Sequence, residues 1–131
     1  MTRINCIPVT ELTDKHLVAE YRELPRVFTL AVKAWHRGMN FETDCPVRYT
    51  LGVGHVKFFY SKLKWLMRRY ESLVAEMLNR DFKPSDTLYE SVQNQRLPME
   101  LYNDWVPTRE AQQLNRQRIK ERLGLNVQTD S

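Results

Sequence analysis

The residues best suited to chemistry lie in one short segment near the start of the chain. Arg22 and Arg26 are four residues apart, and Glu23 follows His16 by seven, so on a helix each pair shares a face. A carboxylate beside two arginines can act as a general acid or base next to phosphate-binding groups. The same pattern is typical of a solvent-exposed ion-pair ladder, and taken alone these residues favour that simpler interpretation.

A second candidate is the turn Gly52-Val53-Gly54, which precedes the predicted start of a helix. Backbone N–H groups at such a start can hold a phosphate. The turn lacks the preceding strand and the third glycine of a dinucleotide-binding motif, so a simple entry into the helix explains it equally well. The sequence contains no nucleophile elbow, kinase signature or zinc-ligand motif.

Helices must position these residues. The first predicted helix starts at Thr13, which suits an N-cap, and stops at Gly38, with a kink or a break at Pro25. This helix is predicted from apolar residues that recur at steps of three or four, namely Leu17, Tyr21, Leu24, Phe28, Ala31 and Trp35.

A second stripe predicts one long buried helix from about Gly54 to Arg80; it consists of Val56, Phe59, Leu63, Leu66, Tyr70, Leu73 and Met77. A third helix is expected after Pro107 and Thr108, ending at Gly124. No strand pattern is evident in the segments between the helices. We therefore expect an all-α fold of three main helices in a compact single domain over residues 1–124, with residues 125–131 as a flexible tail.

Composition places the chain among ordinary globular proteins, since 42% of its 131 residues are hydrophobic and 27% are charged. The net charge of +4 is unevenly distributed: residues 48–70 hold six basic side chains and no acidic one. Residues 109–122 hold five basic against two acidic side chains. These zones suggest one positive face for a polyanionic partner, although charge runs alone are more often solvated helix faces.

The two cysteines are far apart in the sequence, and the three histidines have no ligand spacing. We therefore expect reduced thiols, no metal and no cofactor. The sequence shows neither a signal peptide nor an apolar run long enough to span a bilayer, so we expect a cytoplasmic protein without a membrane partner.

The segment from Asp14 to Arg26 (DKHLVAEYRELPR) resembles the pyrimidine-dimer DNA glycosylase family typified by the phage endonuclease V. Three further blocks are similar to that family: the opening Thr2-Arg3-Ile4-Asn5, the segment Gly54–Tyr60 (GHVKFFY) and the segment Trp105-Val106-Pro107. The resemblance runs in order over about residues 1–123, with divergence around residues 33–50. The family's aromatic C-terminal tail is not recognisable after Gly124.

The resemblance implies a DNA-repair enzyme whose N-terminal segment is threaded between the helices. Its nucleophile is the α-amine of Thr2, exposed when Met1 is removed, and its essential carboxylate falls on Glu23. The amine attacks the sugar C1′, expels the damaged base and cuts the strand by β-elimination from an imine. The resemblance also assigns the DNA-binding positions, which are Arg3, His16, Arg22, Arg26, Arg118 and Arg122.

On this interpretation the chain is a bifunctional glycosylase and abasic-site lyase, expected to act as a monomer on damaged double-stranded DNA. Two alternatives remain open at the level of sequence. The same amine chemistry would serve on another damaged base, because the catalytic groups act on the sugar. A basic helical protein that only binds nucleic acid would need neither Glu23 nor a free Thr2 amine. A helical structural protein would leave the N-terminal block unexplained.

Overall fold

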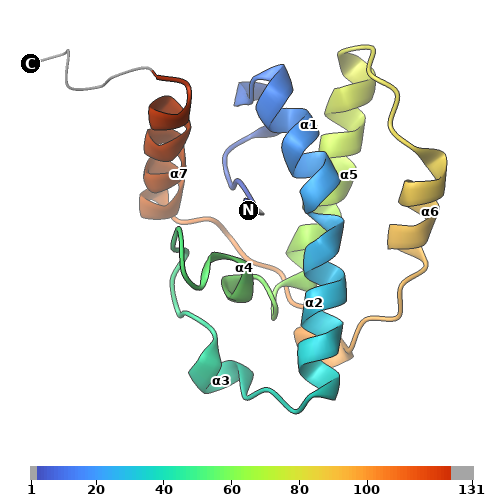
Figure 1. Cartoon of the computed structure of the whole chain (residues 1–131), viewed down its shortest axis with the longest axis vertical. Helices are drawn as coiled ribbons and strands as arrows, with labels where there is room; N and C mark the ends of the chain where they lie inside the picture. The colour runs from blue at the N-terminus through green and yellow to red at the C-terminus, as the bar shows by residue number, and fades with distance from the viewer. Residues whose placement is uncertain (1–2, 125–131) are drawn as a thin grey trace, which may run out of the picture.

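A computed structural model describes residues 3–124, and every regular element in that range is a helix (Figure 1). The elements are η1 (Val9–Glu11), α1 (Asp14–Glu23), α2 (Pro25–His36), α3 (Phe41–Asp44), α4 (His55–Phe58), α5 (Leu63–Asn79), α6 (Asp86–Gln93), η2 (Met99–Leu101) and α7 (Arg109–Arg122). The predicted all-α class is confirmed. None of the helices in the described part of the chain is long and apolar enough to cross a membrane.

The first predicted helix is present, and it is divided at the proline. Thr13 caps α1 by accepting a hydrogen bond from the backbone N–H of His16. Pro25 starts α2, where its missing N–H costs nothing because the first turn has no partner for it. Gly38 has a φ of +82°, and the backbone N–H of Met39 donates a hydrogen bond to the Ala34 carbonyl, which ends α2. The predicted break and stop are both confirmed.

The second prediction, one helix from Gly54 to Arg80, is wrong in one respect. The chain forms two helices, α4 and α5, because it turns between Phe59 and Lys62. The reason is the run Phe58-Phe59-Tyr60, whose three rings are all buried. Consecutive residues of one straight helix point to different sides, so a single helix would leave part of this run in water.

Lys62 completes that turn. Its Nζ atom donates a hydrogen bond of 3.0 Å to the Phe58 carbonyl and lies 3.9 Å from the centre of the Phe58 ring. This cation therefore closes the end of α4, and burial lowers the pKa of Lys62. It belongs to the basic run that the sequence suggested as a DNA-binding face, yet its charge is used within the fold.

The third predicted helix, α7, starts after Thr108, whose hydroxyl oxygen accepts a 3.0 Å hydrogen bond from Ala111 N. Its buried face is narrow and consists of Ala111, Asn115 and Ile119. Two short helices, α3 and α6, were not predicted; each starts at a polar cap, Asn40 or Ser85. They are too short to show a full apolar period.

The helices pack around two aromatic groups. Tyr21 of α1 stacks on Tyr70 of α5 with ring centres 5.9 Å apart. The second group joins the start of α5, the α4 region and the segment before α7; its rings are Tyr49, Phe58, Phe59, Trp65 and Trp105. In Figure 1, α7 stands on one side of the N-terminal segment, with α1 and α5 on the other. Tyr21, Phe59 and Tyr70, which the apolar stripes predicted to be buried, lie in the core.

Candidate functional site

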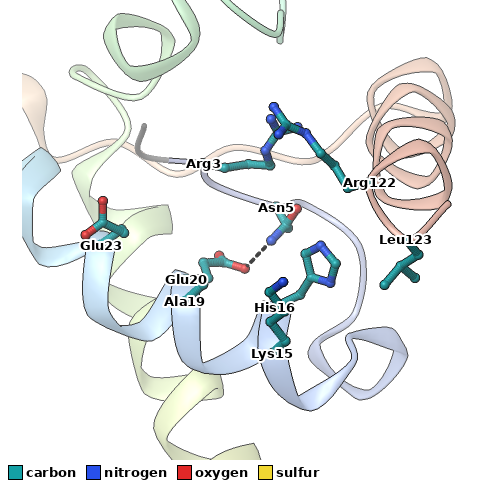
Figure 2. A pocket seen from close by; sticks show the side chains of 9 residues that line it. All are labelled: Arg3, Asn5, Lys15, His16, Ala19, Glu20, Glu23, Arg122 and Leu123. Atoms are coloured by element: carbon teal, nitrogen blue, oxygen red, sulfur yellow. Dashed lines mark hydrogen bonds between the residues drawn. The ribbon is translucent and has the colours of Figure 1, made fainter.

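A pocket of about 370 Å³ lies between α1, the N-terminal segment and the end of α7 (Figure 2). It combines three basic side chains with two carboxylates, since its lining residues are Arg3, Asn5, Lys15, His16, Ala19, Glu20, Glu23, Arg122 and Leu123. Four of the residues expected to bind DNA or catalyse are therefore together here: Arg3, His16, Glu23 and Arg122. Arg22 is exposed, and neither it nor Arg118 lines the pocket.

The spacing on α1 explains the carboxylate side of the pocket. His16, Glu20 and Glu23 follow one another at steps of four and three, so they lie along one face of this helix. That face is turned towards the N-terminal segment rather than fully to solvent, as Figure 2 shows. The predicted sharing of a stripe by His16 and Glu23 agrees with this geometry.

Glu23 is at the accessible end of the stripe. Its side chain is 32% exposed, and its Oε1 atom accepts a 3.0 Å hydrogen bond from Arg26 Nη1. The Arg26 side chain is 63% exposed, so the pair is only partly shielded from water. The carboxylate is thus held by an arginine on the next helix and remains within reach of a bound molecule.

Positive charge accumulates on the opposite wall. Figure 2 shows Arg122 extending from α7 towards Arg3. Burial lowers the pKa of Arg3, and the charges of Arg122 and Arg118 lower it further. The Nη1 atom of Arg3 is buried, and none of the described residues accepts a hydrogen bond from it. Such a group would be satisfied by an anion, whose charge would also relieve the repulsion among the arginines.

His16 contributes an uncharged polar group to the same pocket. Partial burial lowers its pKa, and the neighbouring charges of Lys15, Arg3 and Arg122 act in the same direction. Its Nδ1 atom lies 2.8 Å from the Thr13 hydroxyl, which fixes the ring at the start of α1. A neutral imidazole here can exchange hydrogen bonds without adding to the positive charge.

Both backbone polar groups of Ile4 are hydrogen-bonded to buried side chains. Its N–H donates to His55 Nε2 at 2.8 Å, and its carbonyl accepts from the Tyr49 hydroxyl at 3.0 Å. His55 Nδ1 lies 2.7 Å from the Thr50 carbonyl and must carry the ring proton, which leaves Nε2 as the acceptor. Burial lowers the pKa of His55 and favours this neutral state.

The model for the pyrimidine dimer DNA glycosylase family matches residues 1–90, which is more than half of the chain. The chain belongs to this family. It is therefore a DNA-repair glycosylase, and the resemblance seen in the residues is confirmed. The match includes Arg3, His16, Glu23 and Arg26, whereas α7 with Arg118 and Arg122 lies beyond it.

Sequence reasoning missed a cluster of buried polar side chains at the back of this pocket, formed by Asn5, Glu20, Arg69 and Asn115. One signal was available: Glu20 lies three residues after Leu17 and four before Leu24, on the apolar face of α1. Arg69 was counted in the basic run over residues 48–70, but it is buried and pairs with Glu20. It therefore offers no charge to DNA.

The rest of the predicted positive surface is mixed. Arg48, Lys57 and Lys64 are exposed. Arg118 is half-buried and lies 3.3 Å from a Glu121 carboxylate oxygen. Thr2, the predicted nucleophile, and the predicted tail over residues 125–131 lie outside the described residues.

Proposed function

We propose that this glycosylase excises cyclobutane pyrimidine dimers from double-stranded DNA and then cuts the abasic site as a lyase, with the α-amine of Thr2 as nucleophile. The observation that carries the proposal is the joint presence of Glu23, Arg3 and Arg122 in one pocket beside the first described residues of the chain. An amine, a carboxylate and a phosphate-binding group are the parts that this chemistry needs.

The N-terminus suits the nucleophile because an α-amine has a pKa of about 7.7–8.0 and is partly neutral near physiological pH. A lysine at about 10.4 is almost entirely protonated unless it is desolvated. The neutral amine attacks C1′, the N-glycosidic bond breaks, and the bonding electrons leave with the base. Ring opening at C1′ gives an imine, which acidifies the C2′ proton. Loss of that proton expels the 3′ phosphate, and water then releases the enzyme.

Glu23 would act at two steps of this reaction. Its negative charge stabilises the positive charge that develops on the sugar as the base departs. The same carboxylate can then accept the C2′ proton, because it is accessible at the pocket edge and held by Arg26. Both roles require a charged and positioned carboxylate, which the 3.0 Å contact to Arg26 supports.

Arg3 and Arg122 would bind the phosphates that flank the damaged nucleotide. Their guanidinium groups present planar sets of donors that match phosphate oxygens. The buried Nη1 atom of Arg3 lacks an acceptor among the described residues, and a phosphate oxygen would provide one. Opening the duplex to reach C1′ costs a few kcal/mol, and least at a lesion that has already weakened pairing.

The deciding experiment is borohydride trapping with protein whose N-terminus is verified as Thr2. Duplexes containing one cyclobutane dimer or one abasic site should both give a covalent adduct, because both reach the imine. Protein acetylated at its α-amine, checked by mass spectrometry, should give none. Full trapping by the acetylated protein would move the nucleophile to a lysine. Trapping on abasic DNA but not on the dimer would assign the enzyme another damaged base.

A further inference from the structure

Three helices each contribute one buried polar side chain that contacts the segment Asn5–Ile7. Glu20 comes from α1, Arg69 from α5 and Asn115 from α7. Their exposed fractions are 2%, 7% and 0%. Asn5 itself is 2% exposed. This network is the largest departure from an apolar core in the described part of the molecule, and it lies directly behind the pocket.

The hydrogen bonds of the network run in one direction. Glu20 accepts from Arg69 Nε at 2.8 Å, from Arg69 Nη2 at 2.9 Å and from Asn5 Nδ2 at 2.8 Å. Asn5 Oδ1 then accepts from Asn115 Nδ2 at 2.7 Å. Asn115 Oδ1 finally accepts from the backbone N–H groups of Cys6, at 2.7 Å, and Ile7, at 3.3 Å.

The carboxylate at one end of the network requires this direction. An ionised Glu20 can only accept, so the amide of Asn5 must turn its NH₂ group towards Glu20 and its oxygen towards Asn115. That orientation forces Asn115 to turn its NH₂ group towards Asn5 and its oxygen towards the backbone. The backbone N–H groups of Cys6 and Ile7 can only donate, so they require the same orientation of Asn115 from the other end. The network therefore has one consistent direction from Glu20 to the backbone of Asn5–Ile7. Arg69 adds a hydrogen bond to the Ile7 carbonyl.

Stability alone does not explain such a network. A buried ion pair loses about as much in desolvation as it gains in attraction, and well-packed apolar residues often serve as well. A directional network does provide a single defined position for the segment that it holds. Here that segment leads to Arg3, and the carboxylate that fixes it lies one turn of α1 from Glu23.

We propose that Glu20 is a positioning residue of the glycosylase. Through Asn5 and Asn115, its carboxylate holds the segment that leads to the proposed nucleophile in register with α1 and Glu23. This role rests on the proposed amine mechanism. Only two residues lie between Thr2 and Asn5, so a displacement of the segment at Asn5 is passed on to the nucleophile. A misplacement of about 1 Å at a reacting group costs about 10²-fold in rate.

The test compares the rate and the amplitude of borohydride trapping on a duplex with one abasic site, under single-turnover conditions. Glu20→Gln keeps the shape but replaces one acceptor oxygen by a donor, which opposes the donors of Arg69 and Asn5. The trapping rate should fall by about 10²-fold, while the amplitude and the affinity for the same DNA stay near wild type. Glu20→Asp keeps the charge and should recover part of the rate.

Two further variants keep the outcome decisive. Leu73→Ala leaves a cavity in the core of α5, outside the network, and should lower the unfolding free energy without changing the rate. Asn5→Ala leaves the Glu20–Arg69 pair intact and should also slow trapping, which covers the case of a Glu20→Gln protein that does not fold. Reduced amplitude at a wild-type rate in both network variants would overturn the proposal. Trapping by α-acetylated wild type would instead refute the amine mechanism itself.

Discussion

Loss of the Asn115 side chain should destabilise the fold, because this side chain makes three buried hydrogen bonds to the N-terminal segment. Asn115→Ala deletes the acceptor of two backbone N–H groups and the donor to Asn5, at a site with no solvent exposure. Each buried polar group left without a partner costs about 1–3 kcal/mol. Two of the three contacts are short, at 2.7 Å, so the loss should be about 4 kcal/mol, reduced by up to about 0.7 kcal/mol through the better helix propensity of alanine.

A loss of that size is a large part of the roughly 5–15 kcal/mol by which small domains are stable. Urea unfolding, followed by circular dichroism, should show a midpoint lowered by about 1–2 M at an unchanged slope of about 2 kcal/mol per M. Leu114→Ala is the matched control, because its side chain is 42% exposed on the same helix and makes no contact to the segment through a polar atom. An Asn115→Ala loss no larger than that of Leu114→Ala would refute the reasoning.

Three further outcomes are expected. Glu23→Gln should leave DNA affinity intact and lower base excision by at least about 10²-fold; near-normal turnover would reduce Glu23 to an ion-pair partner of Arg26. Replacing Arg118 and Arg122 together by Gln should flatten the log–log salt dependence of DNA binding by about 1–2 units, and an unchanged slope would show that α7 faces away from DNA. Burial lowers the pKa of His55, so its neutral state should stabilise the fold fully above pH about 6.5. Below that pH the unfolding free energy should fall by up to about 1.4 kcal/mol per pH unit until the folded-state pKa is reached. Urea titrations at pH 7.5 and pH 5 should show that His55→Gln removes most of this pH dependence. A variant whose unfolding free energy depends on pH as strongly as that of the wild type would contradict the role of His55.

Helix ends were predictable because their signals are local. Thr13, Pro25 and Thr108 act on residues within one turn of themselves, through a hydroxyl that accepts a backbone hydrogen bond or through a ring that fixes φ. The break between α4 and α5 was missed for the opposite reason. The apolar period continues in phase across it, and only the demand to bury three consecutive aromatic rings interrupts the helix.

The pocket was predictable in part. The face shared by His16 and Glu23 follows from helix geometry, and the family resemblance supplied Arg3 and Arg122. The partners of Glu20 were not accessible to such reasoning, because Arg69 is 49 residues away on another helix. The burial of Arg69 did have a local signal, because it lies three residues after Leu66 and four before Leu73, whereas Arg68 has Lys64 and Ser72 at four residues. Its pairing with Glu20 had none, since that depends on how α1 packs on α5.

The bond between Asn5 and Asn115 joins residues 110 positions apart, and this separation has a consequence for the synthesis of the enzyme. Ribosomes add about 5–20 residues per second, so Asn115 is synthesised on the order of 5–20 s after Asn5. Late in that interval the growing chain already carries Glu20, Asn5 and Arg69 but lacks the side chain that completes the network. A chain whose translation stops before Thr108 would contain every group matched by the family in residues 1–90 and still lack the residue that completes the network. The network that holds Asn5–Ile7 is thus complete only when α7 is made, so a chain released earlier lacks the Asn115 hydrogen bonds to this segment.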